Sequence, residues 1–477
     1  MDKVIVLCNV GSRDLSLDGQ LLRPVREKGK QVLEHYNAFA PRLDLPIILP
    51  CLRYILKMHP TGIERLVLFG TDQPESPYRQ SDTLHVAEVA VRLVKERLGE
   101  AVSTAEHRLI RGINPALYDE AFELYDAMLA DLHPADDEIC YAIIAGGIPA
   151  CNTALLFQGT RYWGARLRVI YQPQGGEPQE LRIGQQLMET FREAAAIEHL
   201  KRLDFANAMP YLETAHPGLK GLVTFAAQRL AFDFDLAQRT LREAMREGNR
   251  PTRDFIEEHL RHALDDLEAT DGTSRLVALL RELYWNAVIT YRHHHYVDFT
   301  GRVYRFQEAL LRYLVETIFG FSTDLSPQVR ERTQEAWVNS IQANEALHKF
   351  LEGQWVGTRK LDWTEIGRPT YQALLSYAIK KEGLRADGRP FVAHKEIGRY
   401  RKVLDEVNKL DPIIELRHRS IIGHGFQGIS QALLKERCGG ESPPDKLARP
   451  LKILGLLPPG NPYDAIADFV IHSLRRL

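Results

Sequence analysis

The sequence predicts an α/β domain in the first part of the chain and an all-helical remainder. Two observations lead to this fold class. Over roughly the first 180 of the 477 residues, short runs of β-branched and other apolar residues alternate with longer helical patterns. From about residue 184 onward, apolar residues recur at spacings of three and four almost to the end. The first pattern is typical of a doubly wound parallel sheet, and the second of packed helices.

The candidate strands are apolar enough to be covered by helices on both faces, as a parallel sheet requires. They are residues 4–8, 66–69, 141–144 and 167–171. Candidate helices between them lie around residues 21–40, 82–97, 115–132 and 150–162. The later helical patterns cover residues 185–203, 219–247, 252–269, 274–290, 302–319, 326–350, 370–382 and 397–410. With a break near Asp271–Gly272, we expect an α/β domain over 1–183, a helical middle segment over 184–271 and a helical C-terminal domain over 272–477.

Composition excludes some classes of protein. Lys and Arg number 61 against 63 Asp and Glu, a net charge of −2, which argues against a protein that coats nucleic acid without specificity but leaves room for a small basic site. The five cysteines are scattered and form no Cys-x-x-Cys pair, as is usual in a reducing cytoplasm. Neither a signal peptide nor a run of about 18 apolar residues occurs. We therefore expect a cytoplasmic, soluble protein without a membrane partner.

Small and hydrogen-bonding residues follow the candidate strands. Residues 9–14 follow the first strand, 70–73 the second and 145–149 the third. Ligands of open α/β sheets bind outside the carboxyl ends of the strands, so three such loops together predict a ligand site, although each alone would be a tight turn. The loops lack Gly-x-Gly-x-x-Gly and the Walker A pattern, which argues against a dinucleotide cofactor. Pro149 suits the first turn of a helix whose N-terminus, behind Gly146–Gly147, can present N–H groups to an anion.

Two groups of histidines are candidates for chemistry in the helical region. The first is Tyr291–Tyr296, which contains His293, His294 and His295. Consecutive histidines on a helix point about 100° apart and none has a carboxylate in the His-Glu-x-x-His arrangement, so we expect a helix end or turn here and no metal site.

The second group contains Arg417, His418 and His424. On a continuous α-helix, the seven residues from Arg417 to His424 are almost two turns, which leaves both side chains on one face about 20° apart with a rise of about 10 Å. Arg419 would diverge from His424 by about 140°, so Arg417 is the better partner. Gly423 and Gly425 indicate either close backbone access or a local helix end.

An imidazole and a guanidinium together suit metal-independent RNA cleavage. The imidazole exchanges protons near neutral pH, and the guanidinium carries a permanent charge. The reaction needs a ribose 2′-hydroxyl to be activated, charge on the phosphoryl oxygens to be stabilised and the leaving 5′-oxygen to be protonated. The simpler structural interpretation of the same residues is a basic, solvated helix end.

These motifs, in this order, resemble the HEPN ribonucleases with a CARF sensor domain that accompany type III CRISPR systems. The resemblance rests on residues 417–426, on Tyr284–Ala287 and 302–310, which are similar to the helices that open the HEPN domain, and on 145–150, which is similar to the Gly-rich CARF motif. It implies an N-terminal Rossmann-like CARF domain, a helical middle segment and a C-terminal HEPN domain. The implied catalytic residues are Arg417 for phosphate stabilisation, His424 as general acid or base and His418 for positioning or proton transfer.

The resemblance also implies a ligand and a partner. The activator would be cyclic tetra- or hexa-adenylate, with no cofactor or metal, and the substrate single-stranded RNA cut at a composite site of a homodimer that does not associate stably with the CRISPR effector complex. The candidate ligand contacts are Asn9, Gly11, Ser12, Arg13, Thr71, Gly146, Gly147 and Asn152. Many relatives carry Thr-Lys where this chain has Ile148–Pro149, so either Arg13 or Asn152 replaces the basic contact or the ring size differs.

Three alternatives stay open at the level of sequence. The sensor domain either cleaves its activator or only binds it, as both occur among relatives. The chain could instead be a nucleotide-sensing regulatory protein without catalysis, whose helical domain binds a partner. In a third interpretation, a nucleotide-dependent enzyme acts at the strand-end loops, and activity depends on Ser12 and Gly146 but not on His424.

Overall fold

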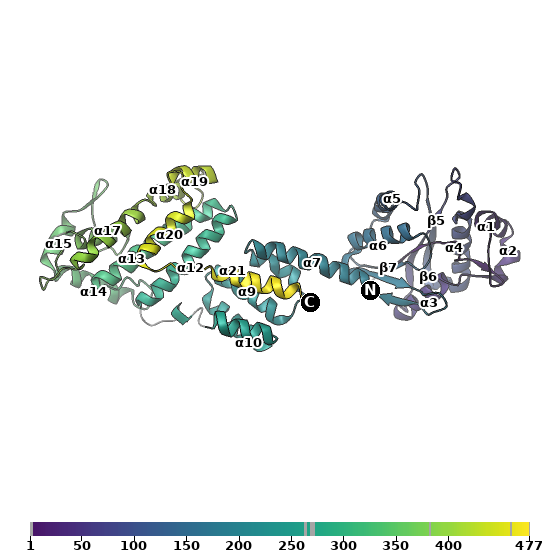
Figure 1. Ribbon diagram of the computed structural model, residues 1–477, viewed down its shortest axis with the longest axis horizontal. Helices are drawn as coiled ribbons and strands as arrows, with labels where there is room; N and C mark the ends of the chain where they lie inside the picture. Colours follow the sequence, from purple (N-terminus) through teal and green to yellow (C-terminus); the bar gives the residue numbers. More distant parts are fainter. Residues whose placement is uncertain (1–2, 262–264, 268–271, 381–382, 458–459, 477) are drawn as a thin grey trace. The chain divides into compact units, whose positions relative to one another are not determined.

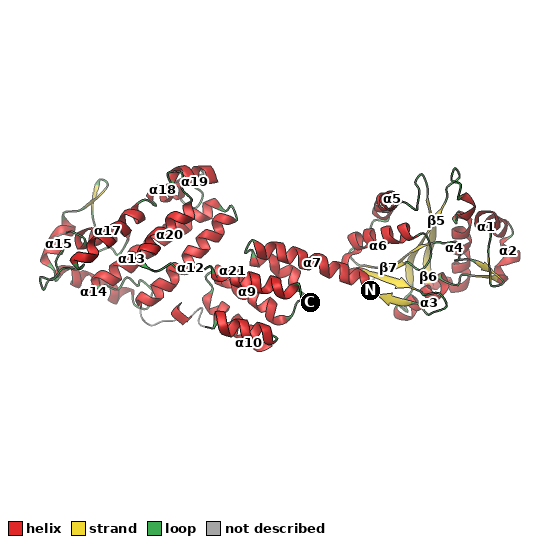
Figure 2. Ribbon diagram, viewed as in Figure 1, coloured by secondary structure: helices red, strands yellow, loops and turns green. Residues whose placement is uncertain are grey.

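The computed structural model of the chain describes residues 3–261, 265–267, 272–380, 383–457 and 460–476. The chain divides into two compact units, residues 1–192 and 193–477, whose elements are labelled in Figure 1 and distinguished as helix or strand in Figure 2. The first unit is α/β and the second is almost entirely helical, which confirms the predicted fold class. The expected boundary near Asp271–Gly272 adjoins residues 268–271, which lie outside the described residues. No described helix is long and apolar enough to span a membrane.

The first unit contains a doubly wound sheet with strand order β6-β5-β1-β7-β8-β9. Its neighbours are parallel except β9, which is antiparallel to β8. The strands are β1 (Lys3–Asn9), β5 (Ile63–Thr71), β6 (Val102–Ile110), β7 (Glu138–Ile143), β8 (Leu167–Tyr171) and β9 (Gln179–Leu181). A small second sheet contains β2 (Ser16–Leu17), β3 (Gln20–Leu21) and β4 (Leu43–Asp44).

Helices cover both faces of the large sheet, because the side chains that its central strands direct to each face are apolar. Val4, Val6 and Cys8 of β1 join a core with α1, α3 and α4, while Ile5 and Leu7 join a core with α5 and α6. The helices of this unit are α1 (Val25–Glu34), α2 (Tyr36–Phe39), α3 (Ile48–Met58), α4 (Leu84–Leu98), α5 (Tyr118–Ala130) and α6 (Pro149–Trp163).

The strand order reverses beside β1. The chain goes from β1 to β5 and β6 on one side and then returns to β7 on the other. The carboxyl ends of β1 and β7 therefore frame the switch point, where open α/β sheets bind their ligands.

The second unit is built from packed helices around two cores. Helix α7 (Ile183–Lys201) leads into it. The other helices are α8 (Phe205–Ala208), α9 (Pro217–Leu230), α10 (Phe234–Glu247), α11 (Arg250–Phe255), α12 (Gly272–Arg292), α13 (Tyr296–Phe319), α14 (Arg330–Gln342), α15 (Glu345–Glu352), α16 (Arg368–Ala378), α17 (His394–Asn408), α18 (Asp411–Arg419), α19 (Gln431–Arg437), α20 (Pro443–Leu454) and α21 (Pro462–Leu474). A short hairpin joins β10 (Trp355–Val356) to β11 (Arg359–Lys360).

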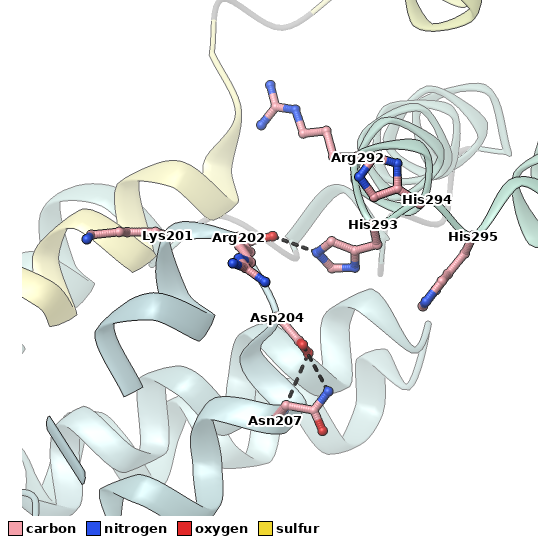
Figure 3. Close-up of a pocket in the computed structure, with 8 residues that line it drawn as sticks. All are labelled: Lys201, Arg202, Asp204, Asn207, Arg292, His293, His294 and His295. Carbon is pink, nitrogen blue, oxygen red and sulfur yellow. Dashed lines mark hydrogen bonds between the residues drawn. The ribbon is translucent and has the colours of Figure 1, made fainter. Parts of the chain in front are cut away.

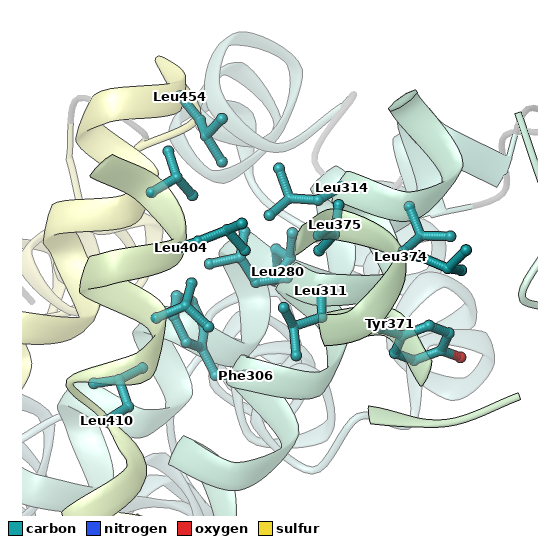
Figure 4. Packing of buried hydrophobic residues seen from close by; sticks show 14 of the residues in the cluster. Leu280, Phe306, Leu311, Leu314, Tyr371, Leu374, Leu375, Leu404, Leu410 and Leu454 are labelled. Carbon is teal, nitrogen blue, oxygen red and sulfur yellow. The ribbon is translucent and has the colours of Figure 1, made fainter. Parts of the chain in front are cut away.

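The larger core surrounds α13. Phe306, Leu311 and Leu314 of this helix are fully or almost fully buried against leucines and Tyr371 from the neighbouring helices (Figure 4). The smaller core joins the middle helices to α21, so the last helix of the chain packs on the middle segment.

Two long helical patterns are interrupted in the structure. The pattern over 219–247 is divided between α9 and α10, because Phe232 adopts left-handed backbone with φ of 62°. The pattern over 326–350 is divided between α14 and α15, where the side chain of Asn344 caps the N-terminus of α15.

A buried ion pair joins α9 to α12 beside the smaller core of the second unit. Arg229 of α9 donates to both carboxylate oxygens of Glu282 on α12, and the Tyr463 hydroxyl donates to Glu282 Oε2 at 2.9 Å. Arg229 and Glu282 are only 4% and 5% exposed, so each charge depends on the other for solvation.

Candidate functional sites

The loops after β1 and β7 pack against each other at the switch point of the sheet. A Cβ added to Gly11 would lie 2.5 Å from the backbone nitrogen of Gly147, and one added to Gly147 would lie 2.6 Å from Cβ of Asn9. Gly147 also has φ of +81°, a conformation that glycine adopts without strain. These contacts explain the small residues that the sequence shows at both loops.

The candidate residues Asn9 and Asn152 hold this arrangement by hydrogen bonds. Asn9 Nδ2 donates to Asn152 Oδ1 at 2.8 Å, and the Tyr125 hydroxyl donates to Asn9 Oδ1. Asn152 Nδ2 in turn donates to the carbonyl oxygens of Gly146 at 2.7 Å and Ile144 at 3.2 Å. The Asn9 and Asn152 carboxamides therefore fix the conformation of the glycine loop through these hydrogen bonds. Pro149 lies in the first turn of α6, as predicted.

The other candidate contacts differ in exposure. Ser12 and Arg13 are exposed on the loop after β1, whereas Thr71 is buried. The backbone nitrogen of Thr71 donates to Thr83 Oγ1 at 3.0 Å, and this hydroxyl donates to the Val10 carbonyl at 3.0 Å. Thr83 thus connects Thr71, at the end of β5, to the first loop. Ser12 and Arg13 are exposed to a ligand.

Asp14 is a component of this site that sequence reasoning missed. It is fully buried, its Oδ2 accepts from the Gly11 backbone nitrogen at 2.6 Å, and its Oδ1 has no hydrogen-bond partner. A Cβ on Gly146 would lie 2.3 Å from Asp14 Oδ2. Burial raises the pKa of Asp14 to about 7, against the opposing effects of the Gly11 hydrogen bond and the Arg13 charge. Only the position of Asp14 in the loop after β1 could have indicated that it contacts the glycines of the site.

The Arg417–His424 motif spans a helix end, so the geometry that a continuous helix would give does not describe it. Helix α18 ends at Arg419, and Ser420 is extended with ψ of 175°. The chain then folds back: the His424 nitrogen donates to the His418 carbonyl at 2.9 Å, and the Gln427 nitrogen donates to the Arg419 carbonyl at 2.9 Å. The offset and rise expected for two turns of helix therefore do not apply.

Glycine is the physical reason for this reversal. A Cβ on Gly423 would lie 2.4 Å from the Arg417 carbonyl oxygen, and one on Gly425 would lie 2.2 Å from the Arg419 carbonyl oxygen. Only residues without a side chain allow the turn to lie this close to the end of α18. Of the two explanations open for the glycines, a helix end is confirmed, and it comes with close backbone contact.

The basic side chains of the motif have different surroundings. The Arg417 guanidinium lies 4.5 Å from the centre of the Tyr304 ring on α13, while Arg419 forms an ion pair with Glu415. The His418 ring lies edge-on to Tyr304 at 6.5 Å between centroids. Partial burial and the charge of Arg417 lower the pKa of His418, with smaller contributions from His424 and Arg368.

Exposed apolar side chains surround this turn. Ile421 is 71% and Phe426 is 94% exposed, and Ile422 contacts α13 at Gly301. Singly exposed apolar residues are common, but large ones grouped beside a basic motif are typical of a surface that another molecule covers.

No family model and no curated protein matches the sequence. A solved structure does match the fold: that of Csm6 from Enterococcus italicus bound to cyclic hexa-2′-fluoro-hexa-dAMP. The match covers 100% of both chains with a TM-score of 0.54 and 11% sequence identity. This chain therefore shares the fold of Csm6 over its whole length, as the resemblance to CARF–HEPN ribonucleases predicted.

Proposed function

We propose that this protein is a metal-independent, single-strand-specific endoribonuclease of type III CRISPR defence that is activated by a cyclic oligoadenylate. The gathering of Arg417, His418 and His424 at the folded-back end of α18 carries the catalytic part of the proposal. The shared fold with Csm6 supports the whole, because that protein was solved with a cyclic hexa-adenylate analogue bound.

The chemistry proceeds by attack of the ribose 2′-oxygen on the adjacent phosphorus. A base removes the 2′-hydroxyl proton, the P–O5′ bond breaks, and an acid protonates the departing 5′-oxygen, which leaves a 2′,3′-cyclic phosphate and a 5′-hydroxyl. His424 serves as acid or base, and Arg417 stabilises the charge on the phosphoryl oxygens. His418, whose pKa is lowered beside Arg417, is neutral over more of the physiological pH range and positions the 2′-hydroxyl or transfers its proton.

The active species in this proposal is a homodimer. His418 and His424 are both exposed at this turn, so each motif can present its imidazoles to a second copy. Ile421 and Phe426 offer an apolar surface directly beside the motif for a second copy to cover. Residues from two motifs would then complete one composite site.

The activator is proposed to bind at the switch point of the first unit. Gly147 and Gly11 let the two strand-end loops pack against each other, and Ser12 and Arg13 are exposed beside them. Arg13 is the basic group of this loop, so it takes the place of the lysine that many relatives carry in the Gly-rich motif.

The deciding experiment measures cleavage of a fluorogenic single-stranded RNA with cyclic tetra- or hexa-adenylate and EDTA present. We expect activated cleavage by the wild type and by the control Arg419→Ala, and none by Arg417→Ala/His424→Ala, which should still bind the activator in calorimetric titration. Cleavage by the double variant would overturn the site assignment. Activator binding by the wild type without RNA cleavage would instead identify a non-catalytic sensor.

A further inference from the structure

A polar cavity in the second unit lies outside both sites described above. It has a volume of about 620 Å³ and is lined from two sides (Figure 3). One side is the end of α7 and the start of α8, and the other is the turn between α12 and α13 that contains the consecutive histidines. The lining residues are Lys201, Arg202, Asp204, Asn207, Arg292 and His293–His295.

The charge of this cavity favours an anion. Three of its side chains are permanent cations and one is a carboxylate, so its formal charge is 3 − 1 = +2 with neutral histidines. Lys201 pairs with Glu198, and Arg292 lies 3.9 Å from Asp464. Arg202 is exposed and forms no ion pair with any residue in the described part of the chain. The charge of Arg202 acts on Glu198 but no direct ion pair occupies its guanidinium among the described residues, so it can bind a phosphate group.

The two turns that line the cavity each have a specific backbone conformation. Leu203 and His294 adopt left-handed conformations with φ of 60° and 62°, which are uncommon for residues other than glycine. Hydrogen bonds hold the two turns, and one of them joins the walls: His293 Nε2 donates to the Arg202 carbonyl oxygen at 2.6 Å (Figure 3). The side chains of both turns are therefore presented from fixed positions.

The cavity is more than a phosphate site, because it also offers an acceptor. Asp204 accepts from Asn207 Nδ2 at 2.9 Å and lies 3.4 Å from His199 Nδ1. Although burial opposes ionisation, hydrogen bonds from Asn207 and His199 lower the pKa of Asp204, so it remains a carboxylate. An inorganic phosphate ion would be repelled by the Asp204 carboxylate, whereas a nucleotide has hydroxyl and amine groups that can donate hydrogen bonds to it. The volume also falls in the range of nucleotide-sized ligand sites.

The position of the cavity connects it to the Arg417 motif. The turn with His295 leads directly into α13, on which Tyr304 contacts Arg417. The eight residues from Tyr296 to Tyr304 correspond to about 12 Å of helix. Consecutive phosphates are separated by about 3.4 Å or more along a strand, so about four nucleotides at most cover this distance.

From these observations we infer that the cavity binds one nucleotide of the RNA strand whose scissile phosphate lies at the Arg417–His424 site. The inference rests on the proposed ribonuclease function. Arg202 contacts a phosphate of the strand, and Asp204 accepts from the ribose of the same nucleotide. In this arrangement His293 holds the turn that contains Arg202, through its hydrogen bond to the Arg202 carbonyl oxygen.

The test measures RNA affinity without cleavage. In the His424→Ala background, fluorescence anisotropy of a labelled single-stranded RNA is compared for Arg202→Glu and for Arg242→Glu, which makes the same charge change on the exposed face of α10. We expect Arg202→Glu to raise the Kd at least tenfold and to reduce the salt dependence of log Kd by about one unit of slope. Arg242→Glu should change the Kd less than twofold.

Further measurements separate the inference from the proposed function. With His424 intact, Arg202→Glu should raise KM for RNA while kcat stays within twofold, and a DNA oligonucleotide of the same sequence should bind more weakly than RNA. Equal effects of Arg202→Glu and Arg242→Glu on Kd, with unchanged thermal unfolding, would overturn the cavity as an RNA site. If the wild type cleaves no RNA with either activator, the proposed function fails, while the anisotropy comparison still decides the binding site.

Discussion

Replacing Gly147 with alanine tests whether the two strand-end loops must pack together to form the ligand site. The substitution has two costs. Left-handed backbone costs an alanine about 1–2 kcal/mol. The new Cβ would lie 2.6 Å from Asn9 Cβ, whereas carbon atoms in contact lie about 3.5–4.0 Å apart, so the loops must separate by about 1 Å. Overpacking of this kind costs about 1–3 kcal/mol more.

Gly175→Ala is the matched control, because it isolates the first cost. Gly175 lies in the loop after β8 with φ of +72°, and no atom lies within 4 Å of its added Cβ. The two variants should therefore differ in free energy of unfolding by about 1–3 kcal/mol, with Gly147→Ala the less stable. For a unit of this size the difference corresponds to about 2 °C or more in Tm.

The assays are thermal unfolding and calorimetric titration with cyclic hexa-adenylate. Movement of the Gly147 loop disturbs the hydrogen bonds of Asn9 and Asn152, so we expect Gly147→Ala to bind the ligand at least tenfold more weakly and Gly175→Ala to bind within twofold of the wild type. Equal Tm values and equal affinities for the two variants would refute the reasoning, because the contact with Asn9 would then have no consequence.

Three further predictions concern buried or partly buried charges. Glu282→Ala should lower the free energy of unfolding by about 3–5 kcal/mol in urea denaturation, because Arg229 is left buried without its partner, and Glu282→Gln should cost less; equal losses would contradict this. Because the folded-state pKa of Asp14 is raised to about 7, its contribution to stability is present at acidic pH and lost as the pH rises toward 7. Between pH 5 and pH 8 the free energy of unfolding of the wild type should therefore fall by about 3 kcal/mol relative to that of Asp14→Asn. If the free energies of unfolding of the two proteins changed in parallel with pH, the raised pKa of Asp14 would be contradicted. Arg417→Ala should raise the pKa of His418 in an NMR titration of its imidazole, whereas an unchanged pKa would show that Arg417 does not act on that ring.

The sequence pattern predicted those strands that are buried on both faces, and it missed those at the edges. Strands β1, β5, β7 and β8 have nearly continuous apolar runs, since helices cover both of their faces. Strand β6 pairs only with β5 and has polar residues such as Glu106 and His107 at partly exposed positions, so its sequence contains no apolar run. The sequence pattern also did not predict α3. This helix follows a proline and the short strand β4, so its apolar residues show no clear start of a helix.

For the candidate sites, sequence reasoning found residue types but not their contacts. Asn9 and Asn152 are hydrogen-bonded but lie 143 residues apart in the sequence, so no local pattern shows that their loops pack together. The same holds for the contact of Asp14 with Gly146 and for the hydrogen bond of Tyr125 to Asn9, both of which depend on tertiary packing.

At the Arg417 motif, a periodicity argument and the structure favour the same arginine for different reasons. Helical spacing favoured Arg417 over Arg419 as the partner of His424, yet no helix connects them. In the structure the distinction comes from contacts instead: Arg419 is held by Glu415, while Arg417 lies over Tyr304 and affects His418. The position of His424 is set by backbone hydrogen bonds to the last turn of α18 and by two glycines that lie against its carbonyls. Any side chain at Gly423 would therefore displace His424 without altering Arg417, His418 or His424 themselves.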